Sequence, residues 1–229
     1  MLTQMISRNA SGQSAARTAR PVPPVGARTS GNAIEMMGAP VPYARDSEIY
    51  GENEPADYLY KVINGTVRTY KVLNDGRRQI GAFYLAGDMF GLEVGDVHTF
   101  SAEAIVDSKV LVIKRSSVIG LAGRDTGVAR ELWTMTANEL QRVQEHILLL
   151  IKTAQERVAG FLLEMAGRST ARDEVNLPMS RQDIADYLGL TIETVSRTLS
   201  QLENSAAIAV PSSRRIVLRN RGALTRMNA

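Results

Sequence analysis

The period of hydrophobic and polar positions changes along the chain. Between residues 46 and 113, apolar and polar residues alternate in short runs separated by turn residues, as they do in β-strands. We expect strands over residues 58–63, 66–73, 79–85 and 109–113, with turns at Asn64-Gly65 and Asn74-Asp75-Gly76. Short strands with such even spacing predict a barrel-like β-roll.

Beyond residue 116 the period is helical. A short helix is expected near residues 118–122, followed by a long helix over residues 126–153. One stripe of the long helix recurs in alternating steps of four and three residues, the period of a coiled-coil seam. The seam residues are Trp133, Thr136, Leu140, Val143, Ile147 and Leu150. A second apolar stripe, at residues 132, 135, 148 and 151, would pack on the β-roll, which favours a dimer over one helix buried in a monomer.

Two short helices joined at a glycine are predicted between residues 180 and 203. Ser180 and Asp183 have the spacing of a capping box, and Gly189 supplies the conformation that ends a helix sharply. Thr191 offers a hydroxyl that can cap the second helix. The buried stripe of the second helix then consists of Val195, Leu199 and Leu202.

The opposite stripe of the second helix is polar. It consists of Glu193, Ser196, Arg197 and Ser200. An acid, an arginine and a small hydroxyl at the start of a helix suit the edges of base pairs in the major groove of DNA. The same spacing also fits an ordinary pair of helices with a solvated polar face.

The stretch from Asp183 to Arg197 resembles the signature of the CRP/FNR family of bacterial transcription regulators, most closely its FNR/FixK branch. This resemblance implies that Glu193, Ser196 and Arg197 read half-sites of the sequence TTGAT. Members of the cyclic-AMP receptor branch carry an arginine at the position of Ile192 and a glycine at that of Ser196. This chain is therefore expected to select different bases from that branch, with Ile192 on the base-reading face of the helix. Residues 59–91 similarly resemble the cyclic-nucleotide-binding-type β-roll of this family.

Two short strands are expected after the second helix, over residues 208–211 and 215–219, around a turn at Ser212-Ser213-Arg214. This pattern is typical of a wing beside a helix-turn-helix. Its arginines and nearby hydroxyl groups are expected to contact phosphates, which adds affinity but no sequence choice. The expected backbone contacts are Ser180, Thr191, Thr194, Ser200, Arg214 and Arg215.

The predicted fold is α+β and divides into four segments. Residues 1–42, with five of the eight prolines and no aromatic residue, are expected to be mostly disordered. Residues 43–123 form the β-roll, residues 124–153 the dimerisation helix, and residues 154–229 a winged helix-turn-helix domain with a flexible C-terminal tail. Net charges of +4, −4 and +3 over residues 1–45, 46–176 and 177–229 suit a DNA-binding module attached to an acidic one.

The sequence carries little recognisable chemistry for sensing a signal. It has no cysteine, which excludes disulfides and a cysteine-ligated iron–sulfur cluster in this chain. Phe100 precedes Ser101 where the cyclic-AMP receptors of the family place the arginine that pairs with the cyclic phosphate. His98 and His146 are the two histidines that could ligate haem iron.

We therefore expect a homodimeric transcription regulator, an activator that binds palindromic double-stranded DNA and contacts RNA polymerase, without a cofactor. The alternative is a regulator of the same fold gated by a cyclic nucleotide or by haem. No catalytic residues or metal ligands are assigned, because no nucleophile–base pair or converging histidines and carboxylates are found in the sequence. With no run of about 18 apolar residues and no secretion signal, we expect a cytoplasmic protein without a membrane segment.

Overall fold

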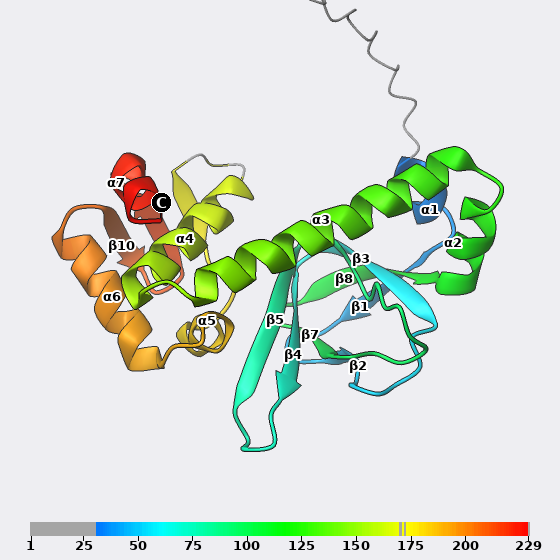
Figure 1. Cartoon of the computed structure of the whole chain (residues 1–229), viewed down its shortest axis with the longest axis horizontal. Helices are drawn as coiled ribbons and strands as arrows, with labels where there is room; N and C mark the ends of the chain where they lie inside the picture. The colour runs from blue at the N-terminus through cyan, green and yellow to red at the C-terminus, as the bar shows by residue number, and fades with distance from the viewer. Residues whose placement is uncertain (1–30, 170, 172, 229) are drawn as a thin grey trace, which may run out of the picture.

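A computed structural model of the chain describes residues 31–169, 171 and 173–228 (Figure 1). Most of the N-terminal segment predicted to be disordered therefore lies outside the described residues. Within them, Gly31–Glu35 forms helix α1 and Ala39–Tyr43 forms strand β1, so the prediction of disorder is wrong for residues 39–42. Strand β1 lies at the edge of a sheet, where Pro40 and Pro42 are tolerated because an edge strand leaves one row of backbone groups outside the ladder.

The β-roll predicted from the sequence consists of two antiparallel four-stranded sheets. The first has the order β1-β8-β3-β6, with the remaining strands at Ser108–Lys114, Tyr58–Asn64 and Met89–Phe90. The second has the order β2-β7-β4-β5, formed by Glu48–Tyr50, Ser101–Ala104, Thr66–Val72 and Arg78–Leu85. Their inner faces bury an aromatic cluster that includes Tyr50, Tyr60, Tyr84 and Phe90.

Helix α2 (Arg115–Ala122) and the 25-residue helix α3 (Thr126–Leu150) follow the roll. The side chain of Asp125 caps α3 by accepting from the backbone N–H groups of Gly127 and Val128. From the roll, α3 runs along the molecule to the C-terminal domain (Figure 1). None of the described helices is both long and apolar enough to cross a membrane.

The second apolar stripe of α3 packs on the roll over only part of its length. Leu132 and Met135 pack against the cluster that joins α1, α2 and the outer face of the first sheet. Leu148 and Ile151 are exposed, so the prediction is wrong for this end of the helix. Leu149 is buried there instead, because α3 has passed from the roll to the C-terminal domain and a different side of the helix meets protein.

The C-terminal domain is a winged helix-turn-helix. Its helices are α4 (Ala154–Gly167), α5 (Arg181–Leu188) and α6 (Ile192–Asn204). An antiparallel sheet of order β10-β11-β9 completes it, formed by Ile208–Ser212, Arg215–Leu218 and Glu174–Asn176. Strands β10 and β11 are the two strands of the predicted wing.

The end of the chain is helical rather than a flexible tail. Residues Arg221–Asn228 form α7, whose Leu224 has no exposed surface and belongs to the core of the C-terminal domain. The side chain of Lys152 also donates to the backbone carbonyl of Asn228. The sequence does not predict this helix, because the segment contains several arginines and only one narrow side of the helix is apolar.

The roll and the C-terminal domain share an apolar core. Ile80, Phe83 and Ile105 of the roll belong to the same buried cluster as the helices of the C-terminal domain. The ring centroid of Phe83 lies 5.2 Å from that of Tyr187 on α5 and 6.3 Å from that of Phe161 on α4. The two domains predicted from the sequence therefore pack directly against each other and are not joined only by a flexible linker.

Candidate nucleic-acid interface

The first helix of the helix-turn-helix begins and ends as its sequence predicts. The Ser180 hydroxyl accepts a hydrogen bond from the backbone N–H of Asp183 at 3.1 Å, and Asp183 Oδ2 accepts from the backbone N–H of Ser180 at 2.9 Å. These two bonds make the predicted capping box. Gly189 ends α5 in the left-handed conformation at φ 61°, which glycine adopts without the strain of a side chain.

The second helix presents one buried and one exposed stripe. The Thr191 hydroxyl caps it by accepting from the backbone N–H of Thr194 at 3.2 Å. Its predicted buried stripe is confirmed, since all three side chains, Val195, Leu199 and Leu202, lie in the core. Its other side is open to solvent at the end of the molecule remote from the roll (Figure 1). The exposed residues of this side are Ile192, Glu193, Ser196, Arg197 and Ser200.

The charge state of Glu193 suits a hydrogen-bond acceptor. A hydrogen bond from its own backbone N–H and one from the Thr191 hydroxyl hold the pKa of Glu193 below its ordinary value of 4.5, and Arg197 one turn away adds to this effect. The carboxylate is therefore ionised at neutral pH and can only accept. A cytosine N4 amino group is the donor that the major groove offers to such a side chain.

The expected backbone-contact residues differ in how free their side chains are. Ser180 and Thr191 use their hydroxyls in the caps, Thr194 is half-buried, and the Ser200 hydroxyl donates to the Ser196 carbonyl at 3.2 Å. Each hydroxyl has a single proton, and those of Ser180, Thr191 and Ser200 are already donated to Asp183, Glu193 and the Ser196 carbonyl, so a phosphate contact through any of them would require that bond to be exchanged.

The arginines of the wing and of α5 are not equivalent. Arg214 is exposed, but Arg215 forms a two-point ion pair with Glu174 of β9, at 2.6 and 2.7 Å. A phosphate contact by Arg215 would require this pair to open. Arg181, which the family signature starting at Asp183 does not include, has a guanidinium nitrogen without a hydrogen-bond partner among the described residues. That nitrogen is buried, and burial lowers the pKa of Arg181, so a phosphate contact at the start of α5, where the first helix of such a motif crosses the DNA backbone, would require this side chain to move into solvent.

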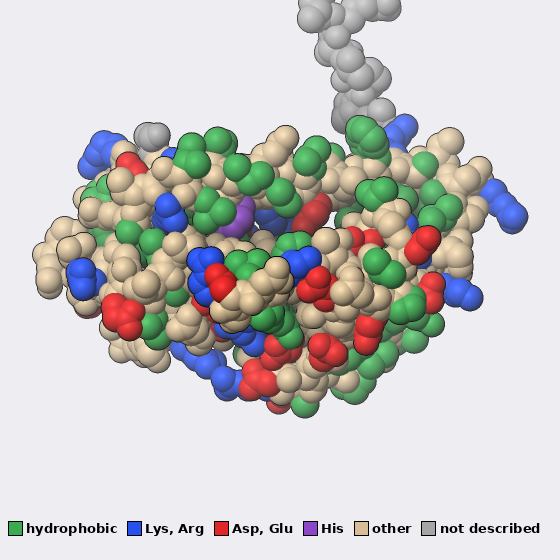
Figure 2. Space-filling view, turned by 60° about the horizontal axis from the view of Figure 1, so that its bottom comes forward, with side chains coloured by type: hydrophobic (Ala, Val, Ile, Leu, Met, Phe, Trp, Pro, Cys, Tyr) green, Lys and Arg blue, Asp and Glu red, His purple; other side chains and the backbone are tan. Residues whose placement is uncertain are grey.

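Acidic side chains gather mostly over the β-roll on the face in Figure 2. This distribution agrees with the net charge of −4 for residues 46–176. Helix α6 lies in the part of the chain that carries a net charge of +3. A polyanion would be attracted to the C-terminal domain and repelled by the roll.

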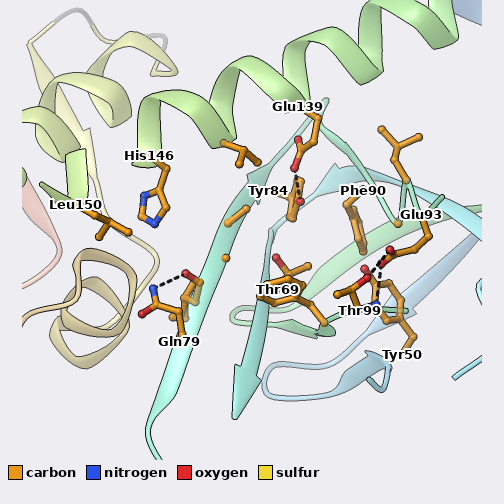
Figure 3. A pocket seen from close by; sticks show the side chains of 17 residues that line it. Tyr50, Thr69, Gln79, Tyr84, Phe90, Glu93, Thr99, Glu139, His146 and Leu150 are labelled. Carbon is orange, nitrogen blue, oxygen red and sulfur yellow. Dashed lines mark hydrogen bonds between the residues drawn. The ribbon is translucent and has the colours of Figure 1, made fainter. Parts of the chain in front are cut away.

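A cavity of about 420 Å³ lies between the roll and α3 (Figure 3). Its walls include four aromatic residues, Tyr50, Tyr84, Phe90 and Phe100, and two acids, Glu93 and Glu139. The Tyr84 hydroxyl donates to Glu139 at 2.8 Å, and Glu93 accepts from the backbone N–H of Thr99 at 3.0 Å. No lysine or arginine is among the residues that line the cavity, so a cyclic phosphate would meet two carboxylates and no counter-charge.

The two histidines occupy different places. His98 has no exposed surface and stacks on Tyr50 at 3.5 Å, whereas His146 lines the cavity and stacks on Tyr187 at 4.1 Å. Burial lowers the pKa of both imidazoles. No group of three or more histidine or acidic side chains suited to a metal ion occurs in the part of the chain that the structure describes.

Known protein families match both halves of the chain. Residues 156–227 match the Crp-like helix-turn-helix domain, and residues 40–125 match the cyclic nucleotide-binding domain. The nitrogen fixation regulation protein FixK of Azorhizobium caulinodans is 52% identical over 202 residues, which cover 86% of this chain and 82% of the relative. The protein of the same name from Rhizobium meliloti is 41% identical over 175 residues, covering 76% and 80% of the two chains. The chain belongs to the CRP/FNR family of transcription regulators, in its FixK branch.

The solved structure of FixK2 from Bradyrhizobium japonicum has the same architecture, with a TM-score of 0.81 at 56% identity. The superposition covers 84% of this chain and 98% of that one. The α+β fold expected from the sequence, with its roll, long helix and winged helix-turn-helix, is thereby confirmed. As a FixK-like member of the CRP/FNR family, the chain is a DNA-binding regulator and not an enzyme.

Proposed function

We propose that the chain acts as a homodimer that reads a palindromic operator with TTGAT half-sites and activates transcription without a bound effector. The observation that carries this proposal is the exposed polar stripe on α6, which projects from a domain that the roll and α4 hold in place. Two copies related by a two-fold axis would place their reading helices in major grooves about one helical turn apart.

The chemistry of the stripe matches the proposed half-site. Glu193 accepts from a cytosine N4 amino group, and Arg197 donates twice to the O6 and N7 atoms of a guanine. Ser196 is small enough to lie against a thymine methyl group. Ile192, exposed at the first turn of α6, adds an apolar contact in place of the arginine of the cyclic-AMP receptor branch.

The surface of α3 supports a dimer. Along the seam, the side chain of Trp133 is 75% exposed and that of Ile147 is 57% exposed. Thr136, Leu140 and Val143 are also exposed and Leu150 is partly buried. An exposed apolar row with coiled-coil period is well suited to the same row of a second copy.

The loop at residues 93–99 is the proposed contact for RNA polymerase. Val94 at its tip is fully exposed, and Arg115 fixes the loop by donating to the backbone carbonyls of Gly95 and Glu93 at 2.6 and 2.8 Å. An ordered loop with an exposed apolar tip can dock on another protein at a small entropic cost.

The proposal is tested by selecting bound sequences from a random DNA pool with purified protein free of nucleotide and haem. We expect two TTGAT half-sites in inverted orientation, and sedimentation of a dimer in the same buffer. Enrichment of single, unpaired half-sites would contradict the dimer, and loss of specific binding in the absence of an added ligand would contradict effector independence.

The cavity between the roll and α3 has room for a small ligand and so supports a second candidate, a regulator gated by a ligand, although its two carboxylates oppose a cyclic phosphate. Calorimetry with cyclic AMP and cyclic di-GMP, together with an absorption spectrum of freshly purified protein, distinguishes the two. Heat of binding accompanied by tighter operator binding would favour ligand gating, whereas specific binding by clean apo-protein would exclude it.

A further inference from the structure

Two arginines of the roll meet two aspartates of α5. Arg68 on β4 contacts Asp183 at 2.6 Å, and Arg78 on β5 contacts Asp183 at 2.7 Å. Arg78 also donates through Nε to Asp186 at 2.8 Å. These four residues, called the ionic clamp here, join strands of the roll to the first helix of the DNA-binding domain.

The clamp is largely shielded from water. Arg68 is 8% exposed and Asp183 4% exposed, and Arg68 is held from its other side by both carboxylate oxygens of Glu103 at 3.0 Å. Both arginines lie over the ring of Tyr70, each 5.9 Å from its centroid. A buried pair with several directed bonds is costly to break, because each charge would be left in a poorly solvated place. An exposed surface ion pair lacks this property.

Asp183 connects the clamp to the start of the helix. Its Oδ2 accepts the capping-box bonds of Ser180, while its Oδ1 accepts from Arg68 and Arg78. One carboxylate thus begins α5 and ties it to the roll. Helix α5 packs in turn on the buried stripe of α6, so an orientation imposed on α5 is passed to the reading helix.

We propose that Arg68 and Arg78 are positioning residues for DNA reading. They hold α5, and through it α6, in one orientation relative to the roll and α3 without any ligand. In a dimer joined along α3, this fixes the separation of the two reading helices and hence the half-site spacing that binds best. The inference rests on the proposed function, but the clamp itself can be tested without DNA.

The first experiment compares two adjacent arginines. Arg78→Gln removes clamp contacts, whereas Arg77→Gln removes an exposed charge whose ion pair, with Asp75, stays within the hairpin. Operators with native half-site spacing and with one base pair inserted are titrated with each protein. We expect Arg78→Gln to lower the preference for native spacing about tenfold, within the range of coupled residues in one network. Base choice inside each half-site is retained, and Arg77→Gln behaves as wild type.

Two results would overturn the inference. The first is an unchanged spacing preference in the Arg78→Gln variant. The second is tighter binding of this variant to the native operator, which would mean that the clamp restrains a non-binding arrangement. Arg78→Lys, which keeps the charge but cannot donate from two nitrogens in a fork, should lie between Arg78→Gln and wild type.

The second experiment measures the orientation directly. Because the chain has no cysteine, Lys109→Cys in the roll and Gln201→Cys on α6, both exposed positions, give two specific spin-label sites. Doubly labelled chains are diluted into unlabelled protein so that distances within one chain are measured. A narrow distribution is expected for wild type and Arg77→Gln, and a broad one for Arg78→Gln.

An equally narrow distribution in the Arg78→Gln variant would refute the clamp, even if the protein binds TTGAT palindromes as proposed. Conversely, the distance distribution could broaden in the Arg78→Gln variant while the wild type shows no preference for TTGAT. That result would support the clamp and refute the proposed half-site. The two proposals therefore fail on different measurements.

Discussion

The proposed function assigns the guanidinium of Arg197 to the choice of a base rather than to a phosphate contact. It is exposed on α6, one turn from Glu193, so its donors are open to a ligand from solvent. We expect Arg197→Ala to weaken binding to the cognate site by about 1–3 kcal/mol and to relax the choice at the contacted guanine. Arg226→Ala, an exposed arginine of α7, is the matched control. Retained preference for that guanine in titrations of substituted operators would contradict the assignment.

We expect the buried His98 to make the stability of the fold depend on pH. Burial lowers the pKa of this imidazole below 6.5, an effect to which Arg115 adds and which Glu93 and Glu54 partly oppose. Below pH 6.5 the unfolded chain therefore binds more protons than the folded one, and stability falls as the pH is lowered further. We expect thermal unfolding temperatures to drop less between pH 7 and pH 5.5 in His98→Phe than in wild type.

Other buried titratable groups also contribute to the pH dependence of stability, in wild type and in His98→Phe alike. The pKa of the Glu164 carboxyl is raised by burial, so its contribution has the opposite sign, and His146 has the same sign as His98. These contributions are common to wild type and to His98→Phe, which keeps the ring stack on Tyr50. Equal pH dependence of the two proteins would show that His98 does not titrate in this range.

At the scale of elements, α3 leaves an apolar row uncovered. Ile147 on the seam and Ile119 on α2 are both 57% exposed, so they form a matched pair. Ile147→Glu should shift sedimentation from the proposed dimer to monomer, because burying an unpaired charge in an apolar interface costs several kcal/mol. Ile119→Glu should leave the mass unchanged. A dimer that persists with Ile147→Glu would place the interface elsewhere.

Helix α7 packs on the C-terminal domain chiefly through the buried Leu224, with Met227 partly buried beside the same core. Leu224 is fully buried, and Leu224→Ala should lower the free energy of unfolding by about 2–5 kcal/mol. Thr225→Ala, on the exposed side of the same helix, should change it by no more than about 0.5 kcal/mol. Denaturant titration gives both values. Equal, small effects would mean that the end of the chain contributes nothing to the fold.

The elements predicted correctly are those whose signals are local. The capping box at Ser180, the turn at Gly189 and the buried stripe of α6 involve residues within a few positions of each other, so the sequence predicts them and the exposed polar stripe of α6. Strands β2 and β6, with three and two residues, are too short to show a period, and the prolines of β1 suggest disorder when its edge position is unknown.

The ionic clamp could not be predicted, because its partners lie far apart in the chain. Arg68 and Asp183 are separated by 115 residues, and each alone fits an exposed charge on a strand or helix. Only the packing of α5 on β5 brings them together. The same holds for Ile80 and Phe83, whose apolar character predicts burial but not that they are buried against the other domain.

At the scale of the whole molecule, the shared core should make the two domains unfold together. Phe83 of the roll is 2% exposed and packs against Phe161 and Tyr187 of the C-terminal domain. Phe90 is similarly buried, but its aromatic neighbours lie within the roll. When two domains bury apolar residues in one cluster, the unfolding of either domain removes contacts that stabilise the other. Calorimetry of the wild type should therefore show one transition.

Truncation of each ring distinguishes a shared core from two independent ones. Phe83→Ala and Phe90→Ala should each cost about 3–5 kcal/mol, since both remove a fully buried ring. Only Phe83→Ala removes contacts between the domains, so it should split the transition in two, whereas Phe90→Ala should lower the temperature of a single one. Protein concentration is held constant, because the proposed dimerisation would itself shift the midpoint. Two resolved transitions in the wild type would show that the core formed by Ile80, Phe83 and Ile105 with the C-terminal helices does not couple the domains.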